Sequence, residues 1–187
     1  ALATALVSRC SSVVAVDPSE NVHDNTFAHE RVQALIEDYR PARQFDLATL
    51  RMVVEHVVDP DAVAEALHRL LRPGGLAIVF TVNRWSPITL LSRATPFALH
   101  GPIKSVIWGG EDKDTFPVQY RMNSRRTLRD VLAARGFEES AFAYLDDLSA
   151  FGFFKGLNSL ELLAWRMLSS LHLRYPENCL LGVYRRI

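Results

Sequence analysis

Apolar and polar positions along the chain of 187 residues follow two periods, one typical of strands and one typical of helices. Six short apolar or β-branched runs predict strands, over residues 12–16, 32–36, 45–50, 76–82, 137–145 and 179–184. Helical spacing predicts helices over 59–72, 124–135 and 158–173, with a broken helix over 20–30. Strands that alternate with helices indicate an α/β fold, in which a mostly parallel sheet is flanked by helices on both faces.

Local signals define the ends of these helices. Asp59 is suited to cap a helix, and Pro60 is suited to its first position. The apolar face of that helix consists of Val63, Ala66, Leu67, Leu70 and Leu71. Gly136 is placed to end the helix over 124–135 in a left-handed conformation. The run over 76–82 is almost wholly apolar, which predicts a central strand buried on both faces.

Residues 84–119 have no steady period and contain Pro87, Pro96, Pro102 and Pro117. So long an irregular stretch inside a compact domain is typical of a lid or a binding segment. Its aromatic side chains, Trp85 and Trp108 among them, argue against a disordered tract. We therefore expect a single domain over residues 1–187, with 84–119 as a lid or substrate insertion.

Composition narrows the class of protein. The formal net charge is zero, so charge alone does not favour a nucleic-acid partner. The two cysteines, Cys10 and Cys179, have no metal-binding or disulfide spacing, and they fit a reducing cytoplasm. No run of 18 apolar residues is present, so no transmembrane helix is expected.

Several segments occur in a family-specific order, and they are listed here in sequence: 13–19 (VVAVDPS), 45–57 (Phe-Asp-Leu through Glu-His-Val), 70–76 (LLRPGGL), 120–123 (YRMN) and 134–137 (ARGF). This order resembles the class I, Rossmann-like S-adenosylmethionine-dependent methyltransferases. The resemblance implies an α/β Rossmann-like fold, S-adenosyl-L-methionine as cofactor and a small-molecule methyl acceptor. The acceptor and its methylated atom stay open.

The resemblance also assigns residues to the cofactor. Asp17, at the carboxyl end of the strand over 12–16, would accept hydrogen bonds from the ribose hydroxyls, with Pro18 beside it. The competing interpretation is an aspartate that only forms the turn before proline. Leu35 and Ile36 would border adenine, although this position often holds an acid in the family, and core packing is nearly as good an explanation for both.

Two further elements of the family site fall at the end of the strand over 45–50. Leu50 and Arg51 would present backbone carbonyls to the methionine part of the cofactor. His56 would face the transfer site, where a neutral imidazole can take a proton from the acceptor. The alternative role for His56 is to orient its loop.

Glu55-His56 also resembles part of an E-x-x-E-H cluster, with which some ubiquinone-biosynthesis O-methyltransferases hold a divalent cation. Met52 stands where that cluster has its first acid, so no metal is expected.

The glycine-rich loop of the family has no counterpart, since the chain contains no G-x-G. Residues 1–11 resemble the end of the helix that follows this loop, so we expect the first strand and the loop to be missing, in an incomplete gene product or a degenerate homologue. A nicotinamide-dependent oxidoreductase is disfavoured, because it would need G-x-G-x-x-G or a Tyr-x-x-x-Lys pair, and neither is present. A non-catalytic, methyltransferase-like interaction module stays open as the alternative.

Overall fold

The computed structural model describes residues 7–94, 117–145, 155–173 and 175–187. Its strands are β1 (Val14–Asp17), β2 (Glu30–Gln33), β3 (Phe45–Arg51), β4 (Leu71–Val82), β5 (Phe137–Leu145) and β6 (Cys179–Arg186). Its α-helices are α2 (Pro60–Leu70), α3 (Pro87–Ala94), α5 (Arg125–Ala133) and α6 (Lys155–Ser170), and its 3-10 helices are η1 (Glu20–Asp24) and η2 (Val54–His56).

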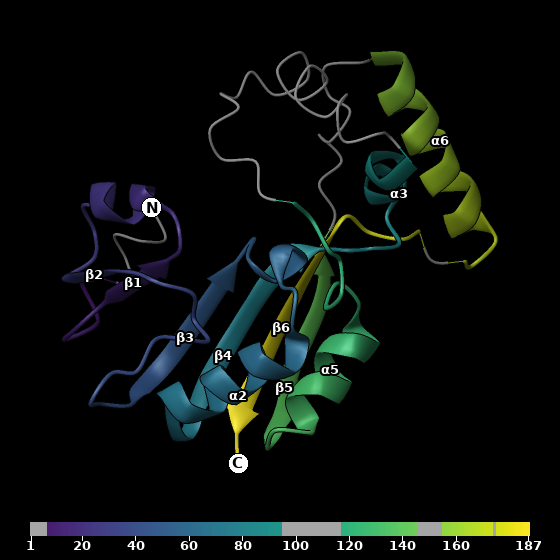
Figure 1. Cartoon of the computed structure of the whole chain (residues 1–187). Helices are drawn as coiled ribbons and strands as arrows, with labels where there is room; N and C mark the ends of the chain where they lie inside the picture. Colours follow the sequence, from purple (N-terminus) through teal and green to yellow (C-terminus); the bar gives the residue numbers. More distant parts are fainter. Residues whose placement is uncertain (1–6, 95–116, 146–154, 174) are drawn as a thin grey trace.

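The described strands form two sheets, a two-stranded sheet β1–β2 and a four-stranded sheet in the order β3–β4–β6–β5. β1 pairs with β2 and β3 pairs with β4 in parallel, whereas β6 runs antiparallel to both β4 and β5. In the four-stranded sheet, β3, β4 and β5 therefore share one direction, and their carboxyl ends lie at the upper edge in Figure 1. The predicted α/β, Rossmann-like fold is confirmed.

The division into two sheets leaves two strand edges open. Among the described strands, β1 has a ladder partner only in β2, and β3 only in β4. Figure 1 shows the β1–β2 pair on the β3 side of the four-stranded sheet. The sequence predicted a mostly parallel sheet, whereas the described strands are divided between two sheets.

The hydrophobic core lies where α2 and α5 pack side by side on one face of the four-stranded sheet. Its fully buried side chains include Val63 and Leu67 of α2, Leu128 and Leu132 of α5, and Val79, Leu180 and Tyr184 of the sheet. Along β4, Ala77, Val79 and Thr81 are buried, but the alternate residues 76, 78, 80 and 82 are only half-buried. The prediction that this strand is buried on both faces is therefore wrong for its second face.

The helix ends follow the predicted signals. Asp59 caps α2 by accepting hydrogen bonds from the backbone N–H groups of Asp61 and Ala62, and Pro60 is the first residue of the helix. Ser124 caps α5 by accepting from Thr127 N. After α5 the chain passes through Gly136 at φ +77°, the conformation that favours glycine.

Other predictions needed correction. The second strand is Glu30–Gln33 instead of 32–36. Its pairing with β1 ends where Ala34 N donates to Asp17 O, and a turn follows, in which Leu35 O accepts hydrogen bonds from Asp38 N and Tyr39 N. Part of the segment over 84–119 is helical, since α3 begins at Pro87. The last helix, predicted over 158–173, is α6 over Lys155–Ser170, and its apolar spacing does not make a buried face, because Leu160, Leu163, Met167 and the following Leu171 are all exposed. Only 20–24 of the broken helix over 20–30 is helical, as η1.

Candidate functional site at the carboxyl edge of the strands

Asp17 is the last residue of β1 and is exposed. Its Oδ1 accepts a hydrogen bond of 2.8 Å from Ser19 N, which closes a turn at the end of the strand. The adjoining Pro18 is also exposed, and its carbonyl accepts from Gln33 Nε2 at 3.3 Å, so the ends of β1 and β2 are tied together. An exposed carboxylate fixed at this edge fits the hydroxyl pair of a sugar, and its turn-forming role is compatible with that use.

Leu35 and Ile36 lie beyond the end of β2, in the turn that follows it. Half of the Leu35 side chain is exposed, whereas Ile36 packs against the hydrophobic core. The two predicted adenine neighbours therefore differ: Leu35 offers an open apolar surface near Asp17 along the β1–β2 pair, and Ile36 is mainly a packing residue.

Leu50 and Arg51 end β3, as predicted. The Leu50 side chain is buried in the core, so only its backbone is available to a ligand. Met52 N donates to Phe80 O of β4, in register with the Arg51–Phe80 pair. Because successive residues of a strand direct their backbone groups to opposite edges, the carbonyl of Arg51 points to the open edge of β3.

His56 lies in η2, directly after β3, and is half-buried. Its Nδ1 is 3.2 Å from the carbonyl oxygen of Pro117. A carbonyl can only accept, so this contact places the proton of a neutral imidazole on Nδ1 and the lone pair on Nε2. The loop that carries His56 is held further, because Gln119 N and Tyr120 N both donate to Glu55 O.

Sequence analysis missed a chain of buried polar side chains beneath this loop. Glu55 is 5% exposed, and its Oε2 accepts a 2.8 Å hydrogen bond from the hydroxyl of Thr81 on β4. The same hydroxyl accepts from Asn123 Nδ2 at 2.8 Å, and this amide also donates to Val82 O. Glu55 and Asn123 stand in the family segments 45–57 and 120–123, and Thr81 is a polar residue within an apolar strand, but no local pattern links the three.

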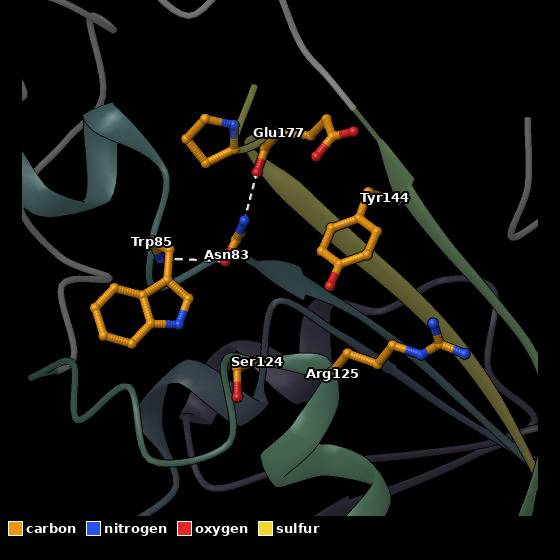
Figure 2. A pocket seen from close by; sticks show the side chains of 7 residues that line it. Asn83, Trp85, Ser124, Arg125, Tyr144 and Glu177 are labelled. Carbon is orange, nitrogen blue, oxygen red and sulfur yellow. Dashed lines mark hydrogen bonds between the residues drawn. The ribbon is translucent and has the colours of Figure 1, made fainter. Parts of the chain in front are cut away.

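A second feature missed by sequence analysis is a cavity of about 220 Å³ beyond the end of β4. Its lining comprises Asn83, Trp85, Ser124, Arg125, Tyr144, Pro176 and Glu177. Figure 2 shows Trp85 and Tyr144 on opposite sides, with Asn83 between them. The Asn83 amide is fixed, since it donates to Glu177 O and accepts from Trp85 N. Asn83 thus holds the backbone of Trp85 at one wall of the cavity, and Trp85 itself is 57% exposed.

Arg125, which lines this cavity, is already engaged. Arg125 makes an ion pair with Glu139 at 2.6 Å, and this hydrogen bond is the main reason why the pKa of Arg125 is raised. Arg121 donates to Val58 O at 2.7 Å. Trp108, the other aromatic candidate of the insertion, lies outside the described residues.

For metal binding, the described part of the chain offers no group of three or more His, Cys, Asp or Glu side chains. Glu55 turns its carboxylate inward to Thr81, and Met52 next to β3 is exposed.

Among the described residues, no helix has the length and apolarity needed to cross a bilayer.

The fold is that of a Rossmann-like, class I methyltransferase. A family model described as methyltransferase domain matches residues 2–139, and the chain belongs to this family.

Curated relatives agree with this assignment over part of the chain. It is 33% identical over 93 residues to a ubiquinone biosynthesis O-methyltransferase of Pseudomonas paraeruginosa, which covers 44% of the chain and 40% of that relative. A ubiquinone biosynthesis O-methyltransferase of Caulobacter sp. is 40% identical over 83 residues, which covers 39% of the chain and 33% of the relative. The matches thus span well under half the length of these relatives.

Solved structures share the fold at low sequence identity. The N-methyltransferase NodS from Bradyrhizobium japonicum WM9, in complex with S-adenosyl-L-homocysteine, has a TM-score of 0.57 at 14% identity and covers 100% of this chain and 72% of its own. Geranyl diphosphate C-methyltransferase from Streptomyces coelicolor A3(2) has a TM-score of 0.58 at 15% identity, covering 98% and 66%. These neighbours support the methyltransferase fold of this chain.

Proposed function

We propose that the protein transfers a methyl group from S-adenosylmethionine to a hydroxyl oxygen of a small molecule, with His56 as the general base. The observation that carries this proposal is the contact of His56 Nδ1 with Pro117 O, which leaves the lone pair of the neutral ring on Nε2. The names of the two curated relatives reported above, both O-methyltransferases, support oxygen as the methylated atom.

Each residue of the edge has a defined part in this proposal. When bound, S-adenosylmethionine supplies a methyl group that is reactive because it is attached to positively charged sulfur. Asp17 accepts hydrogen bonds from the ribose hydroxyls, with Pro18 beside it and Leu35 and Ile36 next to the adenine. The backbone of Leu50 and Arg51 holds the amino-acid end. His56 Nε2 takes the proton of the acceptor hydroxyl as the methyl group moves to its oxygen, and later releases it to water.

The cavity beside Trp85 is the proposed place of the acceptor. A cavity of 150 Å³ is known to hold benzene, so the roughly 220 Å³ here suits a single substituted ring. Trp85 and Tyr144 offer aromatic faces for such a ring, and Ser124 lies between them at the floor in Figure 2. The insertion over 84–119, which begins beside this cavity, is the proposed lid or substrate insertion.

Calorimetric titration with S-adenosyl-L-homocysteine tests the cofactor part of the proposal. Asp17→Asn is expected to weaken binding by about 10- to 100-fold, because a hydrogen bond to a charged acceptor contributes about 1.5–3 kcal/mol. Asp24→Asn, an exposed aspartate in η1, is the matched control and keeps the wild-type affinity. If the wild-type chain binds neither S-adenosylmethionine nor its demethylated product, the alternative of a non-catalytic interaction module replaces this proposal.

A further inference from the structure

We infer that Glu55 and Thr81 form a positioning device for His56, in which the buried carboxylate holds the loop so that the imidazole keeps its proton on Nδ1. This inference rests on the proposed role of His56. Glu55 and Thr81 touch no reacting atom; they act through the placement of the neighbouring histidine.

The direction of each hydrogen bond in the chain is determined. Asn123 Nδ2 can only donate, so the Thr81 hydroxyl accepts from it and must give its one hydrogen to Glu55. The Asn123 amide is itself fixed by its second contact, with Val82 O at 3.0 Å. The Glu55 carboxylate therefore meets a donor that has no alternative orientation.

For this role, the place of these hydrogen bonds in the fold matters more than the strength of each bond. Glu55 follows β3, Thr81 lies near the end of β4, and Asn123 precedes α5. One set of hydrogen bonds therefore joins three segments beneath the loop that carries His56. The segment that supplies Pro117 O to His56 is bonded to the same loop through Gln119 N, 2.7 Å from Glu55 O. Rotation of Glu55 would therefore disturb both the histidine and the carbonyl that selects its tautomer.

Stability alone is a poor explanation for this arrangement. A buried carboxylate has a high desolvation cost, and replacing such groups by apolar side chains of similar volume is often neutral or stabilising. Thr81 is completely buried among core residues, where valine would fit the same space. A positioning role explains why Glu55 is kept at this buried place. Its hydrogen bond orients the loop that carries His56, and an apolar side chain could not do this.

The test is the ring ¹⁵N spectrum of His56 in labelled, cofactor-free protein, at a pH where the imidazole is neutral. Thr81→Val is expected to reduce the Nδ1–H population by more than about twofold, because the loop loses the bond that orients it. Glu55→Met is expected to give the same loss. Thr81→Ser and Glu55→Gln keep a hydroxyl donor and an oxygen acceptor, and both are expected to retain the wild-type signal.

Thr89→Val is the matched control, since Thr89 is also buried and bonded, to Ser86, but lies outside this chain of bonds. An unchanged Nδ1–H population in both Thr81→Val and Glu55→Met would overturn the inference, as would an equal loss in Thr89→Val. The measurement needs neither cofactor nor acceptor. Failure of cofactor binding therefore removes the proposed function, while an unresponsive tautomer removes only the positioning role.

Discussion

β6 of the four-stranded sheet and β1 of the β1–β2 pair both contain apolar side chains, but these side chains are buried to very different degrees. Leu180 and Tyr184 of β6 are 0% and 1% exposed, whereas Val14, Ala15 and Val16 of β1 are only half-buried. A two-stranded unit is marginally stable without further packing. The proposed base His56 and the proposed acceptor cavity thus lie on the well-packed part, and the predicted ribose contact Asp17 lies on the poorly packed part.

Truncation of a core leucine gives the largest expected difference between the two regions. Leu67 of α2 is 1% exposed, so Leu67→Ala should lower the free energy of unfolding by about 2–5 kcal/mol. Leu35, beyond β2, is 50% exposed, and Leu35→Ala should change it by less than about 0.5 kcal/mol. Urea unfolding of both variants measures the contrast, and equal losses would mean that the two regions are equally packed.

The next effect concerns a glycine in β6. A Cβ at Gly182 would lie 2.5 Å from Cε2 of the buried Tyr184 ring, which has little room to move. Gly182→Ala is expected to destabilise the protein by about 1–3 kcal/mol, as overpacking does. At Gly156 nothing lies within 4 Å of the added Cβ, so Gly156→Ala is the control in the same thermal unfolding experiment. A neutral Gly182→Ala would show that the sheet core adapts.

Removal of a helix cap in each region is expected to lower the free energy of unfolding by less than the core substitutions do. Ser124 caps α5 on the sheet core, and Ser124→Ala should cost about 1 kcal/mol. Ser19 accepts from Asn21 N at the start of η1, and Ser19→Ala should cost less than about 0.5 kcal/mol because little core depends on that turn. The denaturant midpoints of unfolding of the two variants measure this difference. A larger loss of stability in Ser19→Ala than in Ser124→Ala would contradict the comparison.

The smallest predicted effect is a pH dependence from His68 of α2. Burial first, and the charge of Arg186 second, lower the pKa of His68, whose ring meets Phe137 edge-on. The unfolded chain then binds the proton more tightly, so this contribution to stability is complete above the ordinary imidazole pKa and is lost as pH falls. His68→Gln should flatten the stability profile on the acid side of neutrality, whereas an unchanged slope would remove His68 as its source.

Where local chemistry decides the structure, the sequence was sufficient. The Asp59–Pro60 start of α2, the Gly136 turn and the strand over 137–145 depend on neighbouring residues, and the structure confirms all three. The end of β2 was misplaced because Leu35 and Ile36 are apolar although they lie in a turn. The end of β2 is determined by its pairing with β1, and the periodicity of apolar residues gives no information about that pairing.

The site was predictable only in outline. The positions of Asp17 and His56 follow from the order of strands, so the family pattern located them after β1 and β3. The bond from Thr81 to Glu55 spans 26 positions and that from Asn123 to Thr81 spans 42, so no local signal links them. The same holds for the cavity, whose lining combines the ends of β4, β5 and α5 with residues just before β6.

The two ends of the segment over 84–119 are hydrogen-bonded to residues that lie close to the same edge. Arg84 N donates to Asn123 O at 2.9 Å, and Gln119 N donates to Glu55 O. Doubling the length of a loop whose ends are already joined costs only about 0.6 kcal/mol. A change of length between the two anchored ends therefore leaves the histidine in place as long as Pro117 keeps its contact with the ring.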